Sequence, residues 1–225
     1  MNTPVVLILF NRPETTRRVF QAVRQARPPV LLLVADGPRP DRPGEAERCA
    51  AARAAVEEVD WDCQVLRDFS NANLGCGLRP STGISWAFEH VERAIILEDD
   101  CLPHPSFFPF CEELLERYRD DPEVMMVSGD NFQFGRRRTS DSYYFSVYNN
   151  IWGWATWRRA WRAFDYGIRR WAELKNTPWL AETLGGDKEQ VGYWRAKFDF
   201  IAGGERGIWD YQWTFACWLH GGLAI

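Results

Sequence analysis

The sequence predicts an α/β protein whose central sheet is mostly parallel and flanked by helices. Through the first 130 residues, short runs rich in β-formers alternate with stretches of helical period, the pattern of strands joined by covering helices. The remainder is rich in tryptophans that keep no fixed period, so it is not a repeat array. At 225 residues, 46% of them hydrophobic and 26% charged, the chain is long enough for one domain with a substantial core.

Five strands are expected in the first half, because apolar runs recur there at the spacing of βαβ units. The predicted strands cover residues 4–10, 29–35, 63–68, 94–98 and 123–128. The predicted helices cover residues 13–26, 44–58, 80–93 and 105–120. Pro13 suits the first turn of a helix, because the amide hydrogen that proline lacks has no helical partner there in any case.

The second half begins with a polar stretch and is then expected to be mainly helical. A loop with three arginines at 136–138 leads to residues 143–147, which are predicted to form a further strand. Ten of the twelve tryptophans lie from Trp152 onward. Trp157 and Trp161 recur four residues apart and are predicted to be core residues on one face of a helix.

Composition bears on partners and location. A formal net charge of −4, with acidic and basic residues interspersed, gives no field suited to a nucleic-acid backbone. The apolar run at residues 5–10 lacks a basic region before it and is far shorter than a membrane span, so we expect a buried strand and no transmembrane segment or signal peptide. Six irregularly spaced cysteines without a C-x-x-C pair are expected to be reduced thiols of a cytoplasmic protein, or of one peripheral at the inner membrane face.

An acidic triplet, Glu98, Asp99 and Asp100, closes the predicted strand at residues 94–98. In open α/β sheets this end of a strand is where ligands bind. Three successive carboxylates repel one another unless a cation or hydrogen bonds offset their charge. Mg²⁺ or Mn²⁺ fits best, since such ions take one or two protein carboxylates and fill the other positions with water and phosphate oxygens. The alternative is an acidic turn that stabilises the start of the next helix.

Arg12 and Asp36 follow the first and second predicted strands, at the same expected edge. Arg12 can pair with a phosphate, and the helix that begins at Pro13 adds backbone donors at its amino terminus. Asp36 can accept hydrogen bonds from a nucleotide base. The alternative for both is ordinary turn chemistry, because Asp-Gly and Asn-x-Pro are common turn formers.

The tryptophan-rich half offers two more candidate segments. In the first, interpreted as a loop before a helix, Gly153 lies between Trp152 and Trp154, whose flat indole faces could hold a sugar or another acceptor. In the second, Asp210 is flanked by aromatic residues that could partly desolvate its carboxylate, as suits a general base. The alternatives are core tryptophans and an aspartate that caps a helix.

Five segments besides the acidic triplet resemble GT-A fold glycosyltransferases, specifically bacterial family-2-like proteins sometimes labelled hemolytic-protein-like sugar transferases. The chain is also similar to N-acetylglucosaminyltransferase I of eukaryotes, as a shorter, divergent relative in which proline and paired phenylalanines follow the triplet. The resemblance spans the whole chain and implies the GT-A, or nucleotide-diphospho-sugar transferase, fold. The five segments are residues 11–18, Asp36, residues 127–131, Gly153–Trp154 and residues 209–213.

The resemblance also implies a role for individual residues and a division of the chain. The implied roles are metal ligation by Asp100, contacts to ribose or sugar from Glu98 and Asp99, contacts to the nucleotide from Arg12 and Asp36, and base catalysis by Asp210. One GT-A domain would cover residues 1–225, with a nucleotide-sugar-binding half at 1–130 and an acceptor-binding half at 131–225. Because the chain ends in a glycine turn that enters a strand, we expect a C-terminal portion to be missing.

Two departures limit the transfer of these roles. In the family, a late histidine or a flexible C-terminal loop often completes the metal and diphosphate site, and this chain ends before one could occur. Residues 73–79, which are expected to border the nucleotide pocket, differ from the eukaryotic enzyme and are typical of the bacterial group.

The predicted function is metal-dependent transfer of a hexosyl or N-acetylhexosaminyl group from a nucleotide-diphosphate sugar, with inversion. The group would pass to a hydroxyl of a glycan, lipid-linked or other acceptor. The expected setting is cell-surface glycan synthesis. One alternative is a sugar nucleotidyltransferase, for which a glycine-rich basic loop is expected where this chain has residues 11–13. The other is a non-catalytic surface-binding or hemolysin-like protein, which predicts an exposed apolar face, whereas the tryptophans here alternate with charged residues.

Overall fold

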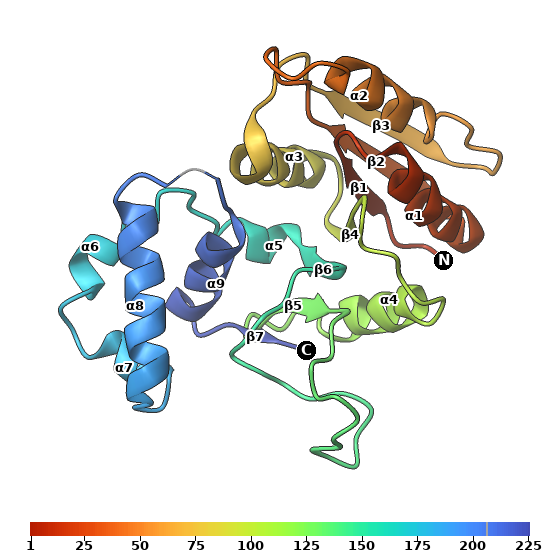
Figure 1. Ribbon diagram of the computed structural model, residues 1–225. Helices are drawn as coiled ribbons and strands as arrows, with labels where there is room; N and C mark the ends of the chain where they lie inside the picture. The colour runs from red at the N-terminus through yellow and green to blue at the C-terminus, as the bar shows by residue number, and fades with distance from the viewer. Residues whose placement is uncertain (206) are drawn as a thin grey trace.

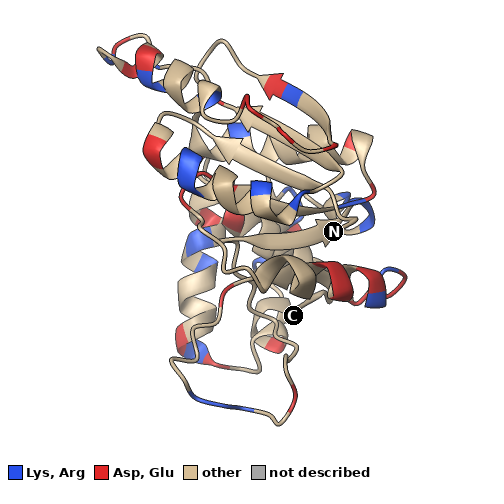
Figure 2. Cartoon of the chain, turned by 90° about the vertical axis from the view of Figure 1, so that its right-hand side faces the viewer, with Lys and Arg blue, Asp and Glu red and all other residues tan. Residues whose placement is uncertain are grey.

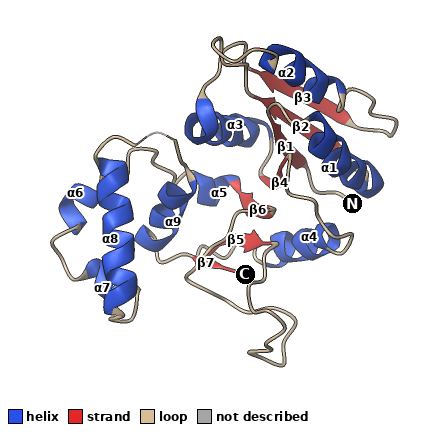
Figure 3. Ribbon diagram, viewed as in Figure 1, coloured by secondary structure: helices blue, strands red, loops and turns tan. Residues whose placement is uncertain are grey.

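The computed structural model, which describes residues 1–205 and 207–225, has a central sheet with helices on both faces (Figures 1 and 3). The strands are β1 (Val5–Leu9), β2 (Val30–Ala35), β3 (Gln64–Phe69), β4 (Arg93–Glu98), β5 (Val124–Ser128), β6 (Trp154–Trp157) and β7 (Leu223–Ala224). In the described ranges their order across the sheet is β3-β2-β1-β4-β6-β5-β7. β6 runs antiparallel to β4 and β5, while the pairs β1–β2, β1–β4, β2–β3 and β5–β7 are parallel. The predicted α/β class with a mostly parallel sheet is therefore confirmed.

The helices of the first half follow the predicted order. The structure has α1 (Pro13–Ala26), α2 (Glu45–Ala54), α3 (Gly75–His90), α4 (Phe107–Arg117), α5 (Arg158–Trp161), α6 (Trp171–Leu174), α7 (Trp179–Thr183), α8 (Lys188–Ala202) and α9 (Asp210–Leu219). α1 has the predicted bounds, and the five predicted strands lie within a residue or so of the observed ones. The larger differences are the early end of α2 and the early start of α3.

α3 begins at Gly75, before the predicted start at residue 80, because its first amides are satisfied from outside the helix. The backbone N–H groups of Leu74 and Gly75 donate to the carboxylate of Asp36 at 2.8 and 2.9 Å. A helix start leaves several such donors without intrahelical partners, and a neighbouring side chain usually accepts them. Here the acceptor comes from the end of β2, so the sequence around Pro80 gives no sign of it.

Each face of the sheet has its own core, and successive strand residues alternate between the two. On β1, Leu7 packs in the core covered by α1, α2 and α4, whereas Ile8 packs in the core covered by α3 and α5–α9. Leu33 and Val34 divide in the same way on β2. Because both faces are buried, these strands are continuous apolar runs, which explains why the sequence predicts them well.

Two secondary-structure predictions for the second half are wrong. Residues 154–157, interpreted as part of a loop before a helix, form β6 between β4 and β5. Residues 143–147, predicted to be a strand, contribute only an isolated bridge between Ser146 and Ala224. Four residues are too few to show a strand pattern, and β6 depends on sheet neighbours that are distant in the chain. The remainder is mainly helical, as predicted, and it ends in the short β7.

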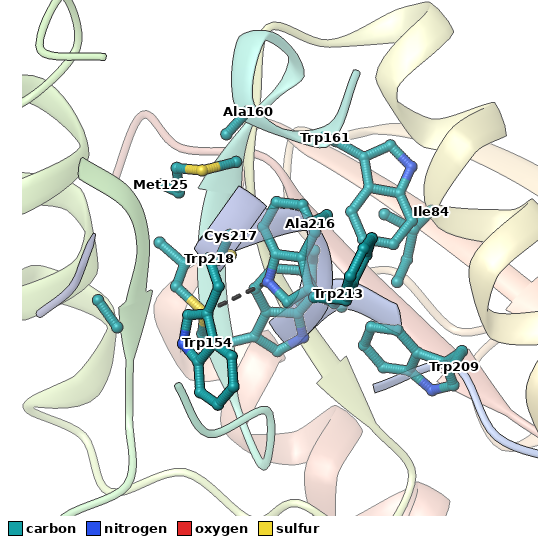
Figure 4. Close-up of a cluster of buried hydrophobic side chains, with 14 of the residues drawn as sticks. Ile84, Met125, Trp154, Ala160, Trp161, Trp209, Trp213, Ala216, Cys217 and Trp218 are labelled. Carbon is teal, nitrogen blue, oxygen red and sulfur yellow. Dashed lines mark hydrogen bonds between the residues drawn. The ribbon is translucent and has the colours of Figure 1, made fainter. Parts of the chain in front are cut away.

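The tryptophans of the second half mostly pack in the core next to α9 (Figure 4). The ring of Trp154 stacks on that of Trp209 with centroids 5.8 Å apart, and Trp161 lies 5.0 Å from Trp213. Trp157 and Trp161 are both buried, as predicted, but they do not share a helix face. Trp157 ends β6 and packs in the opposite core, where its indole N–H donates to a carbonyl of α4 at 3.0 Å.

Over the described residues, none of the helices is at once long and apolar enough to cross a bilayer. All six cysteines carry free thiols, as predicted. The division into halves at residues 1–130 and 131–225 stays a prediction.

Candidate active site

The carboxyl ends of β1, β2, β3, β4 and β5 share one edge of the sheet, because β4 and β5 both run antiparallel to β6. β6 begins at this edge, so the segment before it also lies there. In open α/β sheets this is the edge where ligands bind. The predicted site residues at this edge are Arg12, Asp36, Glu98, Asp99, Asp100, Trp152 and Gly153.

Arg12 joins the end of β1 to the acidic triplet. Its Nη1 donates to Oδ2 of Asp100 at 2.6 Å, and its Nη2 donates to Oδ1 of Asp99 at 2.5 Å. Oδ2 of Asp99 accepts the backbone N–H of Phe10 at 3.0 Å. Burial raises the pKa of Asp99, and Arg12 and the Phe10 amide oppose that shift because they stabilise the carboxylate. Arg12 thus offsets part of the repulsion within the triplet.

Glu98, the last residue of β4, is the most perturbed carboxyl group of the triplet. Burial raises its pKa to about 7, and the negative charges of Asp100 and Asp99 add to the shift, while Arg12 opposes it. Asp210, at the start of α9, also raises the pKa of Glu98. The fold therefore brings Asp210 within electrostatic reach of the triplet, although the two are far apart in the sequence.

Asp210 is the first residue of α9, and Trp209 holds the N-cap position before it. An acidic residue in a first helical turn is favourable by itself, because it meets the positive end of the helix dipole. The segment leading to α9 also contacts the start of α3, where the thiol of Cys76 donates to the carbonyl oxygen of Gly207 at 2.8 Å. Asp210 is half-buried at this junction.

Asp100 is the member of the triplet that is open to a ligand. Arg12 donates to both aspartates, but the side chain of Asp100 is 46% exposed, whereas that of Asp99 is 2% exposed and also accepts a backbone amide. No group of three or more His, Cys, Asp or Glu side chains in the described part of the chain could hold a metal ion. A divalent cation held by Asp100 would therefore have one protein carboxylate and would need water and phosphate oxygens for its other positions, and metal ligation by Asp100 stays a prediction.

Asp36 organises the loop between β3 and α3. Besides the amides of Leu74 and Gly75, its carboxylate accepts the Gly37 amide at 2.9 Å and Nδ2 of Asn73 at 3.1 Å. Nδ2 of Asn73 also donates to the carbonyl oxygen of Gly37 at 2.8 Å. Both carboxylate oxygens therefore have protein donors, and the predicted contact to a nucleotide would have to share or replace one of these bonds.

Glu45, at the start of α2, is a site-edge residue that the sequence does not single out. Its buried carboxylate accepts Nδ2 of Asn11 at 2.9 Å and the backbone N–H of Arg39 at 2.7 Å. Hydrogen bonds from the Arg39 side chain lower the pKa of Glu45 to about 2, although burial opposes the shift. Glu45 thus fixes the loop after β2 against the residue that precedes Arg12. An acidic residue at a helix start is too common to mark this role.

A cleft of about 1110 Å³ lies between the loop before α4 and the segment that joins β5 to β6. Gly129 and Gly153 line it, and the Gly129 amide donates to the Gly153 carbonyl oxygen at 2.8 Å. A Cβ on Gly129 would lie 2.6 Å from that oxygen and from the ring of Phe107, so only glycine fits. Asp130 accepts the backbone N–H of Trp152 at 3.0 Å and thereby holds the approach to β6.

The structure separates the three predicted acceptor contacts. Trp152 and Gly153 line the cleft, and Trp152 is 65% exposed. Trp154 is 1% exposed in the core and is not part of the cleft lining, so its placement does not support a direct acceptor contact. Leu97 and Cys101, which flank the triplet, also line the cleft, so the cleft and the triplet are neighbours.

No protein-family model and no curated protein matches this chain. Among solved structures, it is similar to a UDP-glucose pyrophosphorylase complexed with UDP-glucose, at 12% identity and a TM-score of 0.35, over 57% of this chain and 56% of that one. It is also similar to a cytidylyltransferase from Leptospira borgpetersenii, at 9% identity and a TM-score of 0.38, over 89% of this chain and 74% of that one. The chain thus spans little more than half of the pyrophosphorylase.

Proposed function

We propose that this chain is a metal-dependent glycosyltransferase that uses a nucleotide-diphosphate sugar. The observation that carries the proposal is the charged arrangement at the sheet edge, where Arg12 pairs with Asp99 and Asp100 and where Asp210 lies within electrostatic reach. A cationic fork, an exposed carboxylate and a further carboxylate are together the groups needed to hold a diphosphate and to accept a proton.

The diphosphate of the donor would bind at Arg12 and replace its hydrogen bond to Asp100, which would leave Asp100 free to hold a cation. The guanidinium of Arg12 presents a planar set of donors that suits phosphate oxygens. Asp100 would hold Mg²⁺ or Mn²⁺, and the cation, when bound, stabilises negative charge on the leaving diphosphate. Asp36 would place the nucleotide through the loop that it organises, and Glu98 and Asp99 would lie near the ribose or the sugar.

Asp210 would act as the general base of an inverting transfer. Its carboxylate takes the proton of the acceptor hydroxyl while that oxygen forms a bond to the anomeric carbon. The bond between the anomeric carbon and the diphosphate oxygen breaks, and its electron pair leaves with the nucleoside diphosphate. The acceptor, a glycan or a lipid-linked sugar of the cell surface, would lie in the cleft with a ring against Trp152, beside Gly153.

A sugar nucleotidyltransferase is the second candidate, because it would also place carboxylates for a divalent metal at the edge of a mostly parallel sheet, where Glu98, Asp99 and Asp100 lie here. The two reactions release different products. Glycosyl transfer releases a nucleoside diphosphate from a nucleotide sugar, whereas nucleotidyl transfer joins a nucleoside triphosphate to a sugar 1-phosphate and releases pyrophosphate.

The test measures both products with purified protein and Mn²⁺. A panel of nucleotide sugars with glycan acceptors is assayed for nucleoside diphosphate, and mixtures of nucleoside triphosphates with sugar 1-phosphates are assayed for pyrophosphate. The proposal expects nucleoside diphosphate and a sugar-extended acceptor. Pyrophosphate release without sugar transfer would establish the second candidate instead.

Asp210→Asn tests the assigned base. The variant should lower the transfer rate by about 10²–10⁴-fold and leave the affinity for the nucleotide sugar unchanged, because general-base catalysis acts on the reaction and not on donor binding. Asp120→Asn is the matched control, since Asp120 is an exposed carboxylate after α4 that contacts Arg119. An Asp210→Asn variant that loses donor affinity and rate together would remove Asp210 from the role of base.

A further inference from the structure

The segment that joins β5 to β6 carries an arm, residues 131–142, that projects from the sheet and the helices (Figure 1). Figure 2 shows that a basic stretch lies on this projecting loop, away from the mixed charges on the rest of the surface. The stretch consists of Arg136, Arg137 and Arg138, and Asp141 is the single carboxylate of the arm. The arm is therefore locally basic in a chain with a formal net charge of −4.

The apolar side chains of this region are aromatic and exposed. Phe134 is 89% exposed and Phe132 is 45% exposed. The Phe132 ring contacts those of Phe134 and Trp152, with centroids 6.5 and 5.7 Å apart, so the three rings form one aromatic group. Leaving such a group in water is unfavourable, and contiguous exposed apolar surface often marks an interaction site.

The three arginine charges are not neutralised by carboxylates within the described residues. The Arg137 side chain donates to the carbonyl oxygens of Thr139 and Ser140 at 2.9 and 2.5 Å, and Nε of Arg138 donates to Oε1 of Gln133 at 2.6 Å. These acceptors are uncharged, so they orient the guanidinium groups and leave the positive charge in place. Asp141 is itself engaged by the hydroxyl of Thr139 at 2.7 Å.

We infer that the arm docks on an anionic lipid surface. Phosphate-bearing headgroups would pair with Arg136, Arg137 and Arg138, and the rings of Phe132 and Phe134 would enter the boundary between headgroups and acyl chains. A soluble polyanion would satisfy the arginines but leave the rings in water. A lipid surface meets both requirements, because aromatic residues favour the interface of a bilayer.

Docking would also orient the cleft, because Phe132, Phe134, the three arginines and Trp152 all belong to its lining. A lipid-linked acceptor would then meet the cleft at the membrane surface, a consequence that rests on the proposed function. The docking itself does not depend on sugar transfer, and it can be measured without donor or acceptor.

The experiment is co-sedimentation of the purified chain with vesicles of phosphatidylcholine alone and with vesicles that contain about one third phosphatidylglycerol. The inference expects binding to the anionic vesicles only, weakened at raised salt because the charges are screened. A combined Arg136→Gln, Arg137→Gln and Arg138→Gln variant should bind about 100-fold more weakly, since each basic residue near an anionic surface contributes roughly fivefold. A combined Phe132→Ser and Phe134→Ser variant should also bind more weakly, while its binding keeps the salt dependence.

The matched control removes the same charge from the opposite part of the molecule, through Arg18→Gln, Arg42→Gln and Arg48→Gln. It should leave vesicle binding within about twofold, because these exposed arginines lie outside the arm. Thermal unfolding of every variant shows whether it is folded. No binding to anionic vesicles, equal binding to neutral ones, or an equal loss in the control would overturn the inference, and none of these results would bear on glycosyl transfer.

Discussion

Two regions lie at the same edge of the sheet but differ in construction. The first is formed by the ends of β1, β2 and β4, and the second is the segment between β5 and β6. At the first, charged side chains have defined partners. For example, Asp99 accepts hydrogen bonds from both Arg12 and the Phe10 amide. At the second, the exposed rings of Trp152 and Phe134 both contact Phe132, which is exposed as well. The first is suited to a small charged ligand of fixed geometry, and the second to a larger partner surface.

The two tryptophans on either side of Gly153 differ in the same way, since Trp152 is exposed and Trp154 is buried. Replacing the buried one has the largest expected effect on stability. Trp154→Ala should lower the free energy of unfolding by about 3–5 kcal/mol, because it removes a fully buried indole that packs on Trp161, Trp209 and Trp213. Trp152→Ala should change it by no more than about 0.5 kcal/mol, since that side chain is exposed. Urea unfolding of the two variants measures the difference directly.

In transfer assays, the exposed Trp152 should have a specific effect on acceptor binding. Trp152→Ala should raise the KM for the acceptor and keep the KM for the donor, because its indole lines the cleft. If Trp152→Ala proved as destabilising as Trp154→Ala, the division between a packed core and an exposed acceptor surface would be wrong.

Asp36→Ala should have the next largest effect, at the charged edge. It leaves the amides of Leu74 and Gly75 without their acceptor and should lower the free energy of unfolding by about 2 kcal/mol. Amide hydrogen exchange should accelerate at the start of α3. Asp36→Asn keeps one side-chain oxygen and should recover part of the loss; unchanged exchange at Leu74 and Gly75 in Asp36→Ala would show that the carboxylate does not hold the loop.

Glu45 gives a smaller effect that depends on pH. Its pKa is about 2 in the folded protein, below the ordinary value of 4.5, so its ionised form stabilises the fold. This contribution is fully present above about pH 4.5 and is lost as the pH falls toward about 2. Wild type should therefore exceed Glu45→Gln in free energy of unfolding at neutral pH, and the gap should close on acidification. A gap that stays constant from pH 7 to about pH 2 would contradict the assigned pairing with Arg39 and Asn11.

The sequence predicts the first half of the fold well because β1, β2, β4 and β5 are buried on both faces, and the end of each strand marks the edge of the sheet. Arg12 and the triplet could be placed at that edge for this reason. The hydrogen bond that the Gly75 amide donates to Asp36 could not be predicted, because a helix cap from a distant strand leaves no local pattern.

The tryptophan-rich half was harder to predict for a related reason. Trp157 and Trp161 recur at a helical interval by coincidence, and only the neighbours of β6 in the sheet decide that they lie on opposite faces. The aromatic neighbours of Asp210 and the resemblance both indicate a general base, but its electrostatic effect on Glu98 is a product of tertiary structure. The exposure of Phe134 likewise follows from the path of the arm and not from its local sequence.

The central claim is that the sheet edge binds a nucleotide sugar through Arg12, Asp100 and a divalent cation. Calorimetric titration of a panel of nucleotide sugars, with Mn²⁺ and with a chelator, tests it most directly. We predict that nucleotide-sugar binding requires Mn²⁺ and is lost in Asp100→Asn. Binding should persist in Asp210→Asn, because Asp210 is assigned to the acceptor proton and not to the donor. Binding that is equally tight with the chelator, or that survives Asp100→Asn unchanged, would contradict the account.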